Sequence, residues 1–234
     1  MESFNRPSII IEFNGLPGTG KTTISRCLNK YLSENGIITL TDFSKNRIRR
    51  NHYSTLLNLS CLHLKWILFR YWNTINTTDN RTGRDFVIMH FFRMYKDFLN
   101  TKGCVLIKDQ GIIQALLSMA HLNRINSSKP LDEVVKYLFR SDVMFVRIDC
   151  KTDVNISYDR INSRPTFNAR LDNISNDQLM HSLSTQSHNL SIIRDSFNSI
   201  YSSNMMVLRI DTNEPYTKNA ELIAAQIFKI FNQV

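Results

Sequence analysis

Acidic residues are under-represented in this chain of 234 residues. Asp and Glu together number 20 against 29 Lys and Arg, which leaves a formal net charge of +9. A basic balance favours anionic partners such as nucleotides, nucleic acid or acidic membrane, and it equally fits a soluble protein with a positive surface. The hydrophobic share of 42% and the charged share of 21% are those of an ordinary globular protein. A chain of this length can bury a sizeable core, so disordered and fibrous classes are not expected.

Cysteine is also scarce, and its four positions are far apart: Cys27, Cys61, Cys104 and Cys150. No two of them have C-x-x-C spacing, which argues against a zinc site and against a redox motif. We therefore expect buried free thiols in a reducing compartment, and a cytoplasmic protein.

Long uninterrupted apolar segments are absent. The apolar run near the N-terminus is too short for a signal peptide and leads directly into a glycine-rich turn. The most apolar region, 56–75, contains His63, Lys65 and Arg70, so we do not expect a membrane span. The chain also lacks a Gly/Ser linker, a low-complexity tract and an internal repeat, which favours one domain over residues 1–234.

Short apolar segments alternate with helical patterns along the chain. The segments that read as strands are 8–14, 36–41, 104–108, 143–149 and 205–211. Helical spacing is found at 21–34, 54–75, 84–99, 112–122, 130–139, 153–163, 176–201 and 216–231. Continuous apolar strands separated by helices predict an α/β fold, in which a five-stranded parallel sheet has helices on both faces.

The segment GLPGTGKT, from Gly15 to Thr22, matches the pattern G-x-x-x-x-G-K-[ST] in full. A β-branched strand precedes it and a helix follows it, which is the context that a phosphate loop requires. The glycines let successive backbone N–H groups converge on phosphate oxygens at the positive end of the helix. We expect Lys21 to bridge the β- and γ-phosphates, and the Thr22 hydroxyl to coordinate Mg²⁺. The expected nucleotide contacts in this loop are Gly15, Gly18, Thr19, Gly20, Lys21, Thr22 and Thr23.

Two further features have the residue types that phosphate chemistry uses. Asp109 ends the third predicted strand, the place of the Mg²⁺-linked carboxylate in phosphate-loop proteins, although an aspartate there can also cap a helix. Arg160 and Arg164 are four residues apart, so they share one helix face. Planar guanidinium groups suit stacking on a base and binding of a transferring phosphoryl group, and a solvated basic face is the alternative.

Four features follow one another along the chain: the loop GLPGTGKTT, the strand end Asp109-Gln110-Gly111, the stretch Arg160-Ile161-Asn162-Ser163-Arg164, and the late strand end Ile210-Asp211-Thr212. Their order resembles that of the thymidylate kinase and deoxynucleoside kinase branch of the nucleoside monophosphate kinase-like family. The resemblance extends from Ile9 to Phe231, and only the loop is specific by itself. It implies a P-loop kinase that uses ATP and Mg²⁺, with a helical insert at about 45–100 and a lid at about 160–173. It also implies that one arginine of the pair stacks on adenine, that the other reaches the phosphoryl group, and that Asp211 and Thr212 contact the adenine.

The resemblance also implies an acceptor site at the end of the second strand. Asp42 is the candidate base toward the acceptor hydroxyl, with a turn role as the alternative. Arg84 and Arg93 on the helical insert would suit an anionic acceptor such as a monophosphate, and Gln110 is a further expected acceptor contact. Pro17 replaces the acidic loop residue that is usual in thymidylate kinases, and Gln110 replaces their usual Arg. The donor half of the chain therefore matches the family more closely than the acceptor half.

Three functions remain open at this point. The first is an ATP- and Mg²⁺-dependent phosphotransferase that acts on a nucleoside, a nucleotide or a similar small molecule. The second is a kinase of nucleic acid 5′ ends, suggested by the net charge and the basic run at 45–50, which also fits a solvated face. The third is an ATPase or switch, which the arginine pair disfavours. The apolar helix at 54–75 packs into the core or forms a homodimer interface, as in many kinases of this branch.

Overall fold

The computed structural model describes residues 8–41, 103–120, 143–164, 174–200 and 205–232, together with Ile125, Asp132 and Lys136. In these residues five strands form one sheet with the order β2-β3-β1-β4-β5, and every pair is parallel. The strands are β1 (Ser8–Asn14), β2 (Thr39–Thr41), β3 (Val105–Lys108), β4 (Val143–Lys151) and β5 (Met205–Asp211). The α/β fold class predicted from the sequence is confirmed.

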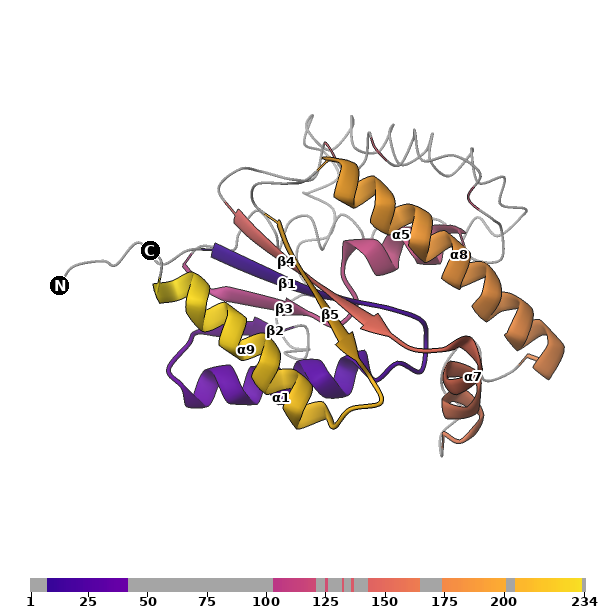
Figure 1. Cartoon of the computed structure of the whole chain (residues 1–234), viewed down its shortest axis with the longest axis horizontal. Helices are drawn as coiled ribbons and strands as arrows, with labels where there is room; N and C mark the ends of the chain where they lie inside the picture. The colour runs from indigo at the N-terminus through magenta and orange to yellow at the C-terminus, as the bar shows by residue number, and fades with distance from the viewer. Residues whose placement is uncertain are drawn as a thin grey trace, which may run out of the picture.

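Helices cover both faces of the sheet (Figure 1). One face is covered by α1 (Lys21–Glu34) and α9 (Tyr216–Asn232), and the other by α5 (Ile112–Ala120) and α8 (Asn176–Ile200). A further helix, α7 (Val154–Asn162), follows the end of β4. None of the helices in the described part of the chain has the length and apolar character needed to cross a membrane.

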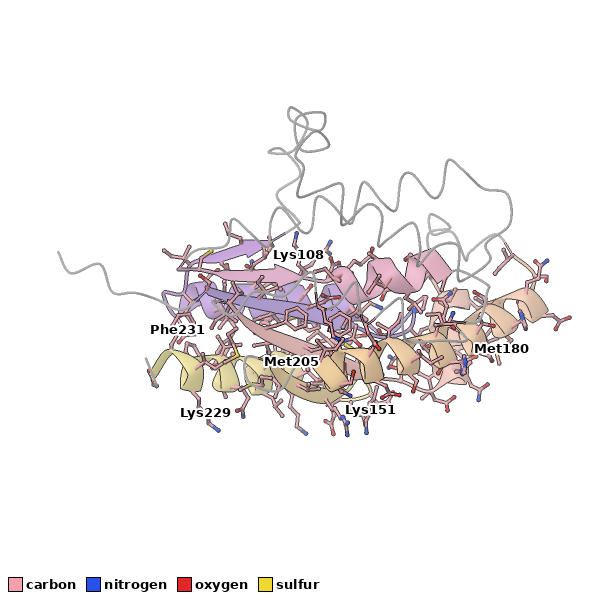
Figure 2. The ribbon with its side chains drawn as sticks, turned by 90° about the horizontal axis from the view of Figure 1, so that it is seen from above. Lys108, Lys151, Met180, Met205, Lys229 and Phe231 are labelled. Carbon is pink, nitrogen blue, oxygen red and sulfur yellow. The ribbon has the colours of Figure 1, made fainter. Side chains whose placement is uncertain are left out.

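The larger core cluster lies between the sheet and the α1/α9 layer. Alternate residues of β1, β3, β4 and β5 point to this layer, so Ile9, Ile11 and Phe13 of β1 meet apolar side chains of both helices. On α9, Phe231 packs against this cluster, whereas Lys229 points away from it (Figure 2). The opposite face is closed by contacts such as that of Phe145 with Phe197, whose ring centroids are 6.3 Å apart.

The second strand is shorter than the sequence predicts. Residues 36–38 do not extend the strand, because Gly36 adopts a φ of 77° and the N–H of Ile37 donates to the carbonyl of Leu32 at 3.0 Å. This is the hydrogen bond of a glycine-terminated helix end, so the segment completes α1 before the edge strand begins at Thr39. The strand β4 is longer than the predicted 143–149, because it continues to Lys151.

Several predictions concern residues that the structure does not describe. Asp42, the helical insert at 45–100 with Arg84 and Arg93, and the part of the predicted lid from 165 to 173 lie outside the described residues. Most of the helix predicted at 130–139 lies outside them as well, and so does the apolar segment 54–75.

Candidate functional site

The loop between β1 and α1 has a backbone that only glycine accommodates at two positions. Gly18 and Gly20 have φ values of 84° and 81°, in the left-handed region that favours glycine. A Cβ atom at Gly18 would lie 2.9 Å from the carbonyl oxygen of Ser157, and one at Gly20 would lie 2.9 Å from the ring of Tyr216. The sequence motif therefore forms the expected turn at the carboxyl end of the central strand, immediately before the start of α1.

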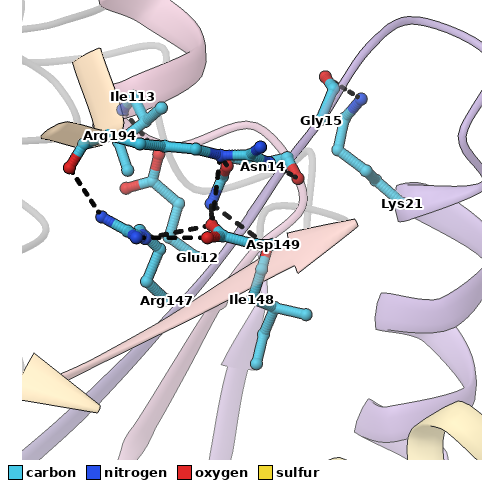
Figure 3. Close-up of polar contacts among 9 residues, drawn as sticks. All are labelled: Glu12, Asn14, Gly15, Lys21, Ile113, Arg147, Ile148, Asp149 and Arg194. Carbon is cyan, nitrogen blue, oxygen red and sulfur yellow. Dashed lines mark hydrogen bonds and ion pairs between the residues drawn. The ribbon is translucent and has the colours of Figure 1, made fainter. Parts of the chain in front are cut away.

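Lys21 is folded back over this loop. Its Nζ atom donates to the carbonyl oxygen of Gly15 at 2.9 Å (Figure 3). It also donates to the carbonyl oxygen of Leu16 at 2.8 Å and to Oγ1 of Thr19 at 3.3 Å. Burial lowers the pKa of Lys21 to about 8, and the nearby Asp109 carboxylate opposes part of this shift. An anion in the loop would stabilise the charged ammonium, because it would supply the counter-charge that the buried position lacks.

Thr22 and Asp109 meet next to the loop. The Thr22 hydroxyl donates to Oδ2 of Asp109 at 2.8 Å, although the two residues are 87 positions apart. A hydroxyl and a carboxylate are the oxygen ligands that Mg²⁺ prefers, so the two residues predicted as metal ligands fit that ion. The carboxylate that accepts from the first turn of α5 belongs to Glu12, whose Oε1 lies 2.6 Å from the nitrogen of Ile113.

The two arginines predicted as a pair have different surroundings. The guanidinium of Arg160 donates to Oγ1 of Thr212 at 3.1 Å, to the carbonyl oxygen of Thr212 at 3.0 Å and to Oδ1 of Asn213 at 3.2 Å. Arg160 and Thr212, both predicted as ATP contacts, are thus joined directly, next to Asp211 at the end of β5. Arg164 lies instead in the wall of the hollow above the phosphate loop.

This hollow has a volume of about 480 Å³. Its floor is the phosphate loop from Pro17 to Thr23, and the described residues of its walls are Gln110, Gln114, Leu117, Ser118, Arg164 and Gln186. Gln110, an expected acceptor contact, thus borders the hollow. Gln114, Leu117 and Ser118 were not predicted, although their three- and four-residue spacing on the helix after Asp109 is a usable signal. No sequence signal identifies Gln186, because its position depends on how α8 packs.

Glu12 is a buried titratable residue that the sequence analysis does not predict as part of the site. It is only 1% exposed, and burial raises its pKa to about 7 against the opposing effect of the backbone N–H groups of α5. A Cβ atom at Gly111 would lie 2.2 Å from Cδ of Glu12, so the glycine of Asp109-Gln110-Gly111 makes room for this carboxyl group. The Glu12 side chain of β1 thus fixes the short segment between Asp109, the expected metal ligand, and helix α5.

The parallel sheet, the loop at the end of its central strand and the Lys21–Thr22–Asp109 arrangement define an α/β protein of the P-loop NTPase fold. No family model matches the chain, and no curated protein matches it. Among solved structures, a shikimate kinase from Acinetobacter baumannii in complex with shikimate is similar over 97% of both chains, with 18% identity and a TM-score of 0.42. A likeness of this size says nothing about the reaction of this chain.

Proposed function

We propose that this protein is an ATP- and Mg²⁺-dependent phosphotransferase whose acceptor is a small molecule, namely a nucleoside or nucleotide as in thymidylate kinase-like enzymes. The observation that carries the proposal is the convergence of three groups on one hollow. Lys21, Thr22 and Arg164 all border the space above the glycine loop, and the Thr22 hydroxyl donates to Asp109. Cations and oxygen ligands around a phosphate loop are what phosphoryl transfer needs, since catalysis of this reaction is mainly positioning and charge stabilisation.

Each residue has a definite task in this reaction. The loop N–H groups hold the phosphate chain, and Lys21 exchanges its carbonyl partners for phosphate oxygens. Arg164 contacts the transferring group as negative charge spreads over its outer oxygens. Arg160, fixed by Thr212 and Asn213, borders the place of the donor base. Mg²⁺ bound at Thr22 and Asp109 would neutralise part of the phosphate charge.

The acceptor enters from the side of α5, where Gln110 and Gln114 border the hollow. Asp42 remains our proposed base, since it follows directly after β2 in the sequence, and Arg84 and Arg93 remain proposed contacts to an anionic acceptor. A homodimer formed through the apolar segment 54–75 is part of the same proposal.

A screen with ATP labelled in the γ-phosphoryl group tests the proposal. The purified protein is incubated with Mg²⁺ and separate pools of nucleosides, nucleoside monophosphates, other small hydroxyl compounds and oligonucleotides with a free 5′ hydroxyl. We expect label in a nucleoside or nucleotide product. Transfer to oligonucleotides alone would instead identify a nucleic acid kinase, and release of inorganic phosphate alone would identify an ATPase.

A further inference from the structure

A cluster of polar side chains, buried except for the partly buried Arg194, lies between the sheet and helix α8 (Figure 3). Asn14 is the last residue of β1, Arg147 and Asp149 belong to β4, and Arg194 comes from α8. The parallel register places Asn14 directly beside Asp149. Side chains two positions apart on a strand share a face, so Arg147 and Asp149 point to the same layer.

Asp149 is the centre of this cluster. Its carboxylate accepts from Nδ2 of Asn14 at 2.9 Å and from Nη2 of Arg147 at 3.1 Å, and Nε of Arg147 lies 3.0 Å from Oδ1. Nε of Arg194 lies 3.3 Å from the same oxygen. One carboxylate thus faces two guanidinium groups, in a layer where the side chain of Arg147 is 1% exposed.

Arg194 reaches beyond Asp149 to the entrance of the phosphate loop. Its Nε donates to Oδ1 of Asn14 at 2.8 Å, and its Nη2 lies 3.5 Å from the carbonyl oxygen of Asn14. In return, Nη1 of Arg147 donates to the carbonyl oxygen of Arg194 at 3.3 Å, which attaches the backbone of α8 to β4. Because Asn14 directly precedes Gly15, α8 is fixed to the residue at which the loop begins.

These contacts are better suited to fixing an orientation than to adding stability. A buried ion pair often contributes no more to the free energy of unfolding than apolar residues of the same size, because desolvation offsets the attraction. Hydrogen bonds between charged groups are directional, however, so they favour one rotation of α8 over others.

The orientation of α8 matters for the hollow in two ways. Helix α8 places Gln186 directly in the wall of the hollow. It also packs against α7, where Leu179 and Leu183 of α8 form a buried cluster with Ile161. Since α7 carries Arg160 and is followed closely by Arg164, a shift of α8 would displace both arginines relative to the loop.

We infer that Arg194 is a positioning residue, which fixes α8 to the strand that ends in the phosphate loop and thereby sets the geometry in which the loop binds a nucleoside triphosphate. The inference rests on the proposed function, because it assumes that the loop binds ATP. It assigns a role in nucleotide binding to a residue that does not line the phosphate hollow.

The test is the affinity for a fluorescent ATP analogue with Mg²⁺, measured together with the midpoint of thermal unfolding. Arg194→Met keeps the length of the side chain but removes its directional contacts, so we expect binding roughly tenfold weaker in a protein that remains folded. Arg194→Lys should restore little, because one ammonium cannot reproduce the fork of contacts to Asn14 and Asp149. This second variant also decides the matter if Arg194→Met does not fold.

Arg209→Met is the matched control. Arg209 lines the same groove between α8 and β5 as Arg194, and its loss changes the net charge equally. Arg209 is exposed. It lies beside Asp149 in the sheet register but forms no hydrogen bond or ion pair with the four residues of the cluster, so we expect unchanged affinity. If Arg209→Met weakened binding as much as Arg194→Met, the effect would be one of general charge, and the positioning role would be wrong.

A double-mutant cycle with Asn14→Leu separates positioning from a general loss of structure. If Arg194 acts through Asn14, the double variant should bind the analogue no more weakly than the Arg194→Met single variant. Additive losses, or wild-type affinity in Arg194→Met, would overturn the inference. Lys21→Ala, measured in parallel, tests the proposed function itself. Wild-type affinity in that variant would show that the nucleotide does not bind at the loop, independently of the role of Arg194.

Discussion

Among single side chains, the two arginines that follow β4 have different surroundings, and we propose a different task for each. Arg160 is held by three hydrogen bonds to Thr212 and Asn213, next to the place that we propose for the donor base. Arg164 faces the phosphate loop across the hollow. Their different contacts predict different kinetic effects on substitution.

Arg164→Ala should lower kcat roughly 10²- to 10³-fold and change ATP affinity little, because an arginine above the transferring group is engaged fully only in the transition state. Arg164→Lys should recover little of the rate, since a point charge does not replace the planar fork. Arg160→Ala should do the reverse and weaken ATP binding. Steady-state kinetics with the acceptor found by the screen measures both, and a pure affinity loss in Arg164→Ala would contradict the assignment.

Between elements, the last residues of β1 connect the walls of the site to its floor. Glu12 accepts from the start of α5, and Asn14 is fixed to α8 through Arg194. Both contacts lie just before the phosphate loop, so the strand that supports the loop also holds the two helices that line the hollow. We expect these junctions to respond to pH as well as to substitution.

Glu12 should make the stability of the fold depend on pH. Burial raises its pKa from the ordinary value of 4.5 to about 7 in the folded protein, so the folded state binds the proton more tightly than the unfolded state. Its contribution is fully present below pH 4.5 and is lost as pH rises through 7, which amounts to about 3 kcal/mol. Arg147, its register partner on β4, is the nearby charge that favours ionisation.

Chemical denaturation of wild type and Glu12→Gln from pH 4.5 to 8 measures this effect. The two proteins should be about equally stable at the acidic end, and the variant should become the more stable as pH rises. Glu34→Gln, an exposed change on α1, is the control and should follow wild type throughout. Parallel curves for wild type and Glu12→Gln would mean that Glu12 stays ionised in the folded protein.

For the molecule as a whole, the sequence was sufficient wherever local pattern determines position. The glycine loop is a contiguous motif, and the carboxyl ends of parallel strands meet at one edge, so the approach of Thr22 to Asp109 follows from topology. The contact of Arg160 with Thr212 has the same origin, since both residues follow the ends of neighbouring strands.

The buried charges could not be predicted in this way. Glu12 and Arg147 each interrupt an apolar strand, and in the sequence each is only a polar exception to the apolar pattern. The sheet register makes the two residues direct neighbours. The contacts of Gln186 and Arg194 depend on the rotation of α8, a long helix whose polar and apolar residues do not mark one clear face. Such positions are set by tertiary packing, which local propensity does not encode.

The decisive measurement is transfer of the γ-phosphoryl group from ATP by Lys21→Ala, compared with wild type and with Lys30→Ala. Lys30 is an exposed lysine on the same helix, so its loss should leave the rate unchanged. Loss of the Lys21 charge should reduce turnover by roughly 10³-fold or more, about 4 kcal/mol, while the thermal midpoint shows that the fold persists. A Lys21→Ala protein that kept more than about a tenth of wild-type turnover would contradict phosphoryl transfer at this loop, since its main cation would then be dispensable.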